Sequence, residues 1–181
     1  MDGAVINPDT KAEIRRAVIL DVLADHVLAH GLAASSLRPL ARAAGISDRM
    51  LLYYFKDKAD VTAAVLDVIA ARLTVMLGDA SGAPLPVAEL RAQLLGALMD
   101  DAIWPYMRIW LEMAALAAQG DAVFANAGEA IGRGFYAWGL AQIAAETSEQ
   151  RAIDAARLLV TIEGIVLLKS LGMGDVAQLA L

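Results

Sequence analysis

The sequence lacks cysteine altogether, and it is poor in histidine, with two, and in proline, with five. Without cysteine the chain forms no disulfide, thiolate metal site or cysteine nucleophile, as is typical of compartments where disulfides are rare. Long apolar runs are missing too, although the hydrophobic fraction is 59%. A membrane-spanning helix needs about 20 mostly apolar residues, but the best candidate, residues 158–171, is interrupted by Glu163 and Lys169. We interpret it as a helix buried on several sides, in a bundle or an oligomer interface.

Motifs of exported proteins and of enzymes are also missing. The first twenty residues carry Asp2, Asp9 and Glu13, where a secretory leader has a basic start and an apolar run, so we expect a cytoplasmic protein. No G-x-S-x-G, phosphate loop or dinucleotide fingerprint occurs, and we predict neither an enzyme nor a cofactor. His26 and His30 are one turn apart, as zinc ligands can be, but there is no H-E-x-x-H motif, and we predict no metal site.

The negative charge is unevenly distributed along the chain. Residues 1–60 carry eight basic and eight acidic side chains, so the whole net charge of −6 falls on residues 61–181. Between Arg38 and Lys58 there are five basic residues and only two acidic ones. A locally basic segment on an acidic body is what a site-specific DNA-binding protein can show, although charged stretches are also common on solvated surfaces.

Helical periodicity dominates the chain, and no stretch alternates apolar and polar residues as a half-buried strand does. Gly31 marks the end of the first helix, because glycine is common just past a helix C-terminus. Residues 78–86, rich in glycine and proline, are the clearest loop. We predict helices over residues 10–30, 36–44, 47–55, 58–77, 87–99, 103–118, 121–145 and 148–171.

The connections between the later helices are short, which indicates antiparallel neighbours in a bundle. We therefore predict an all-α protein of about nine helices, with two domains. The N-terminal domain, residues 1–57, holds three helices, and the C-terminal domain, residues 58–181, is an antiparallel bundle. The helix at residues 58–77 connects them.

Residues 36–55 have the proportions of a DNA-binding helix-turn-helix, two short helices joined by a turn that contains glycine. Ala41 and Ala44 are small enough for the second helix to approach closely, and Gly45 permits the sharp turn. Leu51 and Phe55 anchor the second helix to the core. The side chains left nearer the outside, at the end that enters a major groove, are Asp48, Arg49, Met50, Leu52 and Tyr53.

The run from Ile19 to Gly31, followed by SLRPLARAAGISDRMLLYYFKDKADV at residues 36–61, resembles the N-terminal region of the TetR (tetracycline-repressor-like) family. In that family the second helix reads approximately T-V-R-x-I-A-x-x-A-G-V-S, followed by x-x-x-L-Y-x-H-F-x-x-K. The resemblance covers under a third of the chain. The matching positions are Ser36, Leu37, Arg38, Leu40, Ala41, Ala44, Gly45, Ile46, Ser47, Leu51, Tyr54, Phe55 and Lys58.

The chain departs from the family pattern within the recognition helix. Leu52 stands where the family often has tyrosine, Arg49 where a small residue is frequent, and Asp48 where lysine or arginine is often seen. The base preference is therefore not readable by analogy.

Roles for the exposed residues follow from their chemistry. Arg49 suits a guanine edge, Met50 and Leu52 suit a thymine methyl group, and Asp48 suits cytosine N4 or the helix dipole. Plain packing remains open for Met50, Leu52 and Tyr54, and a solvated side chain for Arg49. The residues suited to phosphate oxygens are Ser36, Ser47, Tyr53, Tyr54 and Lys58.

The resemblance implies a homodimer held by the last two long helices as a four-helix bundle. Glycines within those helices favour close helix approach, because a glycine in a helix interior costs about 1 kcal/mol relative to alanine; exposed, tolerated glycines are the alternative. The predicted interface residues are Gly128, Gly132, Leu159, Gly164 and Leu167.

The resemblance also implies a ligand pocket in the C-terminal domain. The helix at residues 103–118 carries Ile103, Met107, Trp110 and Ala114 on one inward stripe, and methionine and tryptophan suit a small apolar or amphipathic molecule. Ordinary core packing is the alternative for each of them. The predicted pocket residues are Met99, Ile103, Trp104, Met107, Trp110, Phe135 and Trp138.

Together these features predict a sequence-specific DNA-binding transcriptional regulator, a repressor released from a palindromic operator by a small ligand. Its predicted partners are double-stranded DNA, a second copy of the chain and that ligand, with no membrane. The alternative is a helical adaptor or degenerate regulator that binds a protein partner rather than DNA.

Overall fold

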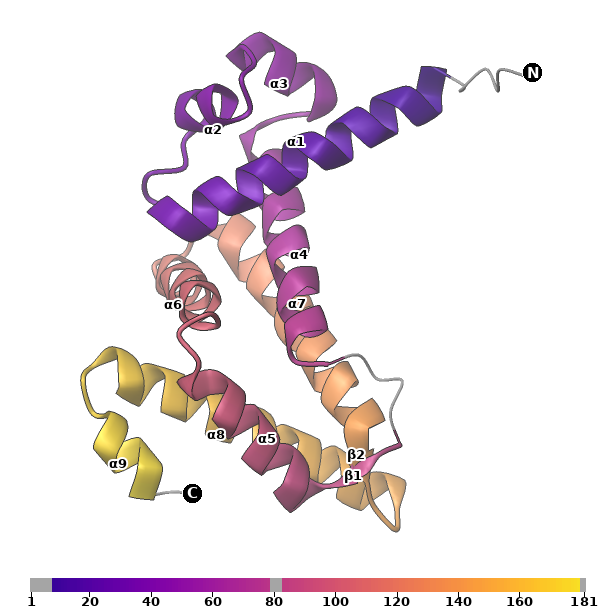
Figure 1. The fold of residues 1–181 in the computed structure, drawn as a ribbon, viewed down its shortest axis with the longest axis vertical. Coiled ribbons are helices and arrows are strands. Elements are labelled where there is room, and N and C mark those ends of the chain that lie inside the picture. Colours follow the sequence, from indigo (N-terminus) through magenta and orange to yellow (C-terminus); the bar gives the residue numbers. More distant parts are fainter. Residues whose placement is uncertain (1–7, 79–82, 180–181) are drawn as a thin grey trace. The chain divides into compact units, whose positions relative to one another are not determined.

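The computed structural model describes residues 8–78 and 83–179, which form nine helices and two very short strands (Figure 1). The predicted all-α fold class is confirmed. The helices are α1 (Pro8–His30), α2 (Leu37–Ala43), α3 (Asp48–Tyr54), α4 (Lys58–Met76), α5 (Val87–Met99), α6 (Trp104–Ala118), α7 (Ala122–Gln142), α8 (Ser148–Ser170) and α9 (Gly174–Leu179).

The turn between α2 and α3 depends on Gly45, whose φ of +66° lies in the left-handed region that favours glycine. The amide of Gly45 donates to the carbonyl of Arg42, and that of Ile46 donates to the carbonyl of Ala41. These two bonds form a Schellman motif, which satisfies the last carbonyls of α2. The chain is then redirected into α3, as the sequence predicted.

The chain divides into two compact units, which end and begin at Ala70 and Ala71. This division falls within α4, whereas the sequence-based boundary lay just before that helix, at residues 57 and 58. The last turns of α4 join the C-terminal unit, where Leu73 is buried with Met107 and Ile165. Helix α4 thus supplies residues to both units.

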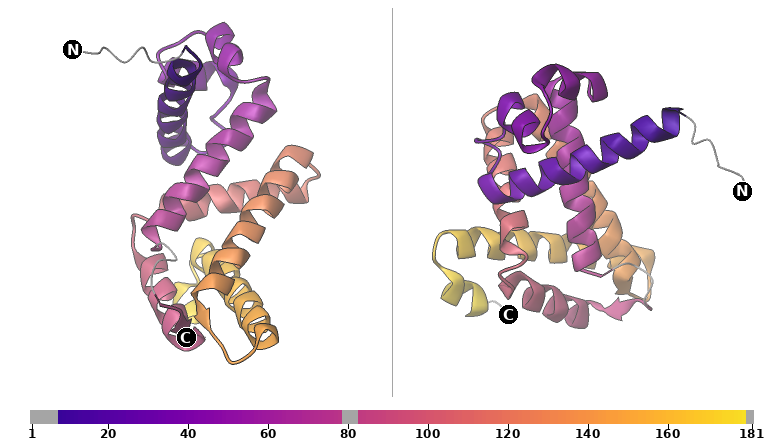
Figure 2. Two further views of the ribbon diagram at one scale, coloured as in Figure 1. Left: turned by 90° about the vertical axis from the view of Figure 1, so that its right-hand side faces the viewer. Right: turned by 45° about the horizontal axis from the view of Figure 1, so that its top comes forward.

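The C-terminal unit consists of α5 to α9 and the end of α4. Helices α5 and α8 lie side by side (Figures 1 and 2). Two cores fill the unit. One core gathers residues of α4, α5, α6, α8 and α9 around Met107, and the other gathers residues of α5, α7 and α8 around Leu90 and Ile143. The segments 87–99 and 148–171 form helices within one residue of the predicted bounds.

Two local predictions were wrong. Strands β1 (Leu85–Pro86) and β2 (Ile143–Ala144) pair in parallel, so Leu85 and Pro86 are not loop, and the seventh helix ends at Gln142 rather than Ala145. Two-residue strands carry no alternation that periodicity can detect. Residues 79–82 of the predicted loop lie outside the described residues, and α9 had not been placed.

Capping residues define where the long C-terminal helices begin. Asp121 Oδ1 accepts the amides of Val123 and Phe124 at the start of α7, and Thr147 Oγ1 accepts the amide of Gln150 at the start of α8. These three bonds satisfy amides that have no partner within the helix. Within the described ranges, no helix is long and apolar enough to cross a membrane.

Candidate functional site

Helix α3 exposes one arginine and several large apolar or aromatic side chains. The hydroxyl of Ser47 accepts the amide of Met50 at 3.2 Å, which confirms the predicted N-cap, and Leu51 is fully buried. With Leu51 turned inward, the other face of α3 is left outside. Met50, Leu52 and Tyr53 are 45%, 42% and 76% exposed, and Arg49 is exposed beside them.

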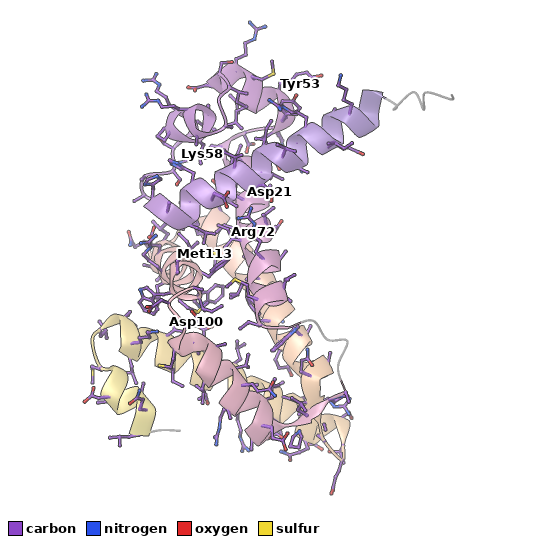
Figure 3. All side chains as sticks on the ribbon, in the orientation of Figure 1. Asp21, Tyr53, Lys58, Arg72, Asp100 and Met113 are labelled. Carbon is purple, nitrogen blue, oxygen red and sulfur yellow. The ribbon has the colours of Figure 1, made fainter. Side chains whose placement is uncertain are left out.

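Further predicted DNA-contacting residues lie at the end of α3 and on the segments before and after it. Ser36 is the N-cap residue of α2, yet its hydroxyl makes no capping bond, whereas Ser35 is buried and donates to the carbonyl of Gly31. Tyr54 is half-buried, and its ring meets that of Tyr53 edge to face at 5.3 Å. Lys58 is exposed in the first turn of α4 (Figure 3). The structure thus brings the predicted DNA-contacting residues to α3 and its two flanks.

Asp48, in the first turn of α3, has a partner that the sequence analysis did not identify. Its Oδ2 lies 4.0 Å from Nε of Arg38 on α2, and both side chains are largely exposed. An exposed pair at this distance contributes little to stability. It does place a positive charge beside the one carboxylate of α3.

A second polar contact joins α6 to α8. Nε1 of Trp110 donates to Oε2 of Glu163 at 2.6 Å. Burial raises the pKa of Glu163 above its ordinary value, and the Trp110 hydrogen bond opposes this shift. No cation contributes to the shift, so the carboxylate stands in the C-terminal unit without a counter-charge among the described residues.

Lys169, six residues further along α8, contacts the other end of α6. Its Nζ donates to the carbonyl of Leu98 at 2.7 Å and lies 4.9 Å from the ring centre of Trp104. The two charges that interrupt the apolar run 158–171 are therefore the two polar partners of the α6 tryptophans. Both charges are visible in the sequence as interruptions of an apolar run, and this is the signal by which their contacts could have been anticipated.

The predicted pocket residues do not form one group. Ile103 and Met107 are buried in the core around Met107, with Trp104 and Phe135 packed against them. The other three predicted residues lie apart: Met99 is 38% exposed, Trp138 packs in the second core and donates to the carbonyl of Gly78, and Trp110 is bonded to Glu163. Ala114, predicted on the inward stripe, is exposed, while Ile109 and Met113 (labelled in Figure 3) are buried instead.

Two of the predicted interface residues, Gly128 and Gly132, face α6 of the same chain. A Cβ on Gly128 would lie 3.8 Å from Cε of Met113, and one on Gly132 would lie 3.7 Å from Cη2 of Trp110. Their lack of a side chain thus already serves packing within the chain. Of the remaining residues, Leu159 is half-buried, while Gly164 and Leu167 are exposed on α8.

The rings of His26 and His30 contact each other on the last turns of α1, with ring centres 4.5 Å apart and an angle of 50° between the ring planes. Burial lowers the pKa of His26, as does the nearby charge of His30, and a backbone hydrogen bond with Ala34 opposes both. The part of the chain that the structure describes holds no group of three or more residues able to ligate a metal. His26 is half-buried and His30 is exposed.

The sequence of the helix-turn-helix region is similar to that of a known protein family. Residues 19–65 match the model of the bacterial regulatory proteins of the tetR family. Over these residues the chain is similar to the TetR family. TetR-family proteins are regulators and not enzymes, and they bind DNA and act as dimers.

A curated relative is similar to the chain over a longer segment. It is similar to the HTH-type transcriptional regulator BetI of Ectopseudomonas mendocina (strain ymp), with 30% identity over 102 residues, 54% of this chain. That match spans about half the length of the curated relative, 52%.

Solved structures share the fold over most of the chain. A transcriptional regulator from Rhodococcus sp. Rha1 superposes with a TM-score of 0.62 and 23% identity, covering 92% of this chain and 86% of its own. GusR of Salmonella enterica superposes with a TM-score of 0.64 and 17% identity, covering 97% and 91%. At these identities the likeness concerns the fold.

Proposed function

We propose that this chain is a TetR-family transcriptional regulator that binds DNA sequence-specifically. It works in the cytoplasm as a homodimer, and a small molecule bound in its C-terminal unit releases it from a palindromic operator. The observation that carries the proposal is the outer face of α3, where Arg49 lies beside exposed Met50, Leu52 and Tyr53. A short helix with an arginine and large apolar side chains on one face suits the edges and methyl groups of a major groove.

Each exposed group has a fitting target on DNA. Arg49 reads a guanine edge through two hydrogen bonds, and Met50 and Leu52 contact a thymine methyl. The Ser47 hydroxyl accepts the Met50 amide, so its own proton remains for a phosphate oxygen. Asp48 accepts from cytosine N4 when Arg38 leaves it. The other phosphate contacts are Ser36, Tyr53, Tyr54 and Lys58.

The second copy of the chain docks on α8 and α7. Val160 and Leu167 are 72% and 50% exposed and lie on one stripe of α8 with exposed Gly164. No atom lies within 4 Å of a Cβ built on Gly164 or on exposed Gly134 of α7. The chain's own packing therefore gives no reason for either glycine, whereas a partner helix that approaches closely does.

The ligand binds in the C-terminal unit, where Trp104, Met107 and Phe135 gather. Leu73, near the end of α4, is buried in the same core, while Lys58 begins that helix. A ligand that changes this core acts on the helix that also carries a DNA contact. Affinity for DNA and for the ligand are then coupled, each lowering the other by the same factor.

An electrophoretic mobility shift with the DNA that flanks the protein's own gene tests the proposal. The wild type should shift this DNA in preference to a shuffled fragment of equal length. Arg49→Ala should lose about 1–3 kcal/mol on the cognate fragment and less on the shuffled one. Arg157→Ala, an exposed arginine of α8, serves as the control. Binding of neither fragment by the wild type would favour the adaptor alternative, and equal binding of both would contradict sequence specificity.

A further inference from the structure

Glu163 of α8 is a half-buried carboxylate of the C-terminal unit. Its Oε2 accepts the indole N–H of Trp110, and it makes no other hydrogen bond or ion pair with the described residues. A carboxylate removed from water is costly unless it is paired or hydrogen-bonded, and one indole donor satisfies only part of its accepting capacity. Burial accordingly raises its pKa.

Among the described residues, no cation forms an ion pair with Glu163 or contributes to its pKa shift. The nearest basic residues on α8, Arg157 and Lys169, are each six residues away. Lys169 is committed elsewhere, because its ammonium donates to the Leu98 carbonyl and lies over the Trp104 ring. On α7, Arg133 pairs with Glu129, at 2.8 Å. The described residues therefore supply no counter-charge to Glu163, and a bound cation could provide one.

The surroundings of Glu163 combine aromatic and apolar surface. The Trp110 indole reaches from Glu163 on α8 to Gly132 on α7, where a Cβ would lie 3.7 Å from the ring. Met107 lies one turn before Trp110 on α6, and Phe135 lies one turn after Gly132 on α7. Both belong to the apolar core of the unit. An aromatic ring beside a carboxylate attracts a cation in two ways: the ring face attracts it by a cation–π interaction, and the carboxylate accepts a charge-assisted hydrogen bond from it.

The same unit already shows this chemistry once. At Trp104, the first tryptophan of α6, the ammonium of Lys169 lies 4.9 Å from the ring centre. At Trp110, the second tryptophan, there is a carboxylate but no ammonium. The two sites differ in that the chain supplies the cation at only one of them.

We infer that Glu163 and Trp110 form the binding point for the ammonium group of an amphipathic amine. The ammonium donates to Glu163 Oε1 and lies against the indole of Trp110, while the apolar part of the amine extends toward Met107 and Phe135. This inference rests on the proposed ligand-responsive function and specifies its ligand class. A charge-assisted hydrogen bond is about twice as strong as a neutral one, so the head group should dominate selectivity.

Three probes with one six-carbon chain and different head groups test the inference: hexylammonium, hexanol and hexanoate. Titration calorimetry on the full chain should show hexylammonium binding at least about tenfold more tightly than hexanol, with hexanoate weakest. Glu163→Gln keeps an oxygen for Trp110 but removes the charge, so it should abolish the preference for hexylammonium over hexanol. Glu149→Gln, an exposed residue of the same helix, should preserve it.

Equal binding of the three probes, failure of hexylammonium to bind, or an unchanged preference in Glu163→Gln would each overturn the inference. The ranking of probes on the wild type needs no variant, so it decides the matter even if Glu163→Gln misfolds. The mobility shift on the same preparation separates the two proposals. DNA binding without hexylammonium binding refutes only the ammonium site, and hexylammonium binding without DNA binding refutes only the DNA-binding function.

Discussion

Gly132 of α7 faces the indole ring of Trp110 on α6, and a Cβ at this position would lie 3.7 Å from Cη2 of the ring. That distance is an ordinary van der Waals contact, so alanine fits where a larger side chain does not. The glycine therefore sets how close α7 lies to the tryptophan that binds Glu163.

Gly132→Ala should raise the free energy of unfolding by up to about 1 kcal/mol, because alanine is the better helix former and meets no clash. Gly132→Leu should lower it by about 1–3 kcal/mol through overpacking against Trp110. Urea unfolding at one protein concentration measures both. Gly96 on α5, where a Cβ would meet nothing within 4 Å, is the control, and Gly96→Leu should show no such loss.

Leu167→Glu should convert a homodimer to monomers while the helical content stays unchanged. Leu167 is 50% exposed on the proposed dimer face of α8, and a buried, unpaired carboxylate opposes association. Sedimentation velocity at micromolar concentration checks this. Ile14→Glu, at a residue of α1 that is 54% exposed, should leave the dimer intact. A wild type that sediments as a monomer would remove the basis of the two-fold operator.

Lys58→Ala should weaken binding to cognate and shuffled DNA alike and reduce the slope of log affinity against log salt by about one. The reason is that a phosphate contact releases a counterion without reading the sequence. Binding isotherms at several salt concentrations give the slope, with Arg157→Ala as the matched control on α8. A slope equal to that of the wild type would count against a phosphate contact at Lys58.

Glu163→Gln should make stability less dependent on pH. Because the pKa of Glu163 is raised above its ordinary value of 4.5, the folded state holds a proton that the unfolded state has lost between these two values. Wild-type stability therefore falls as pH rises through that window and stays lower above it. Glutamine lacks this loss, so the stability of the variant relative to wild type should increase as the pH rises from about 4 through the raised pKa of Glu163. A constant difference would contradict a raised pKa.

Local patterns were sufficient to predict most of the helices. Ser47 and Gly45 mark the ends of α3 and α2 through bonds to residues a few positions away, and such signals are contained in short sequence. The exposed face of α3 followed from the buried spacing of Leu51 and Phe55. The β1–β2 pair joins segments far apart in sequence, and its two residues per strand are too few to show a period.

The C-terminal contacts could not be predicted in the same way. Glycines in α7 indicate that something approaches closely, but the sequence does not say whether α6 of the same chain or a second copy does so; for Gly132 it is Trp110. Glu163 and Trp110 are 53 residues apart, and no local pattern pairs them. The useful sign was a charge within an apolar run, which needs a partner wherever it is buried.

Hydroxyl-radical footprinting on the DNA that flanks the protein's own gene tests the central claim, that α3 of each protomer reads one half of a palindromic operator. Two recognition helices of a dimer enter successive major grooves about 34–36 Å apart. The account predicts two protected regions related by two-fold symmetry and one helical turn apart, which Arg49→Ala loses at concentrations where Arg157→Ala retains them. Uniform protection along the fragment, or the same footprint with Arg49→Ala as with wild type, would contradict it.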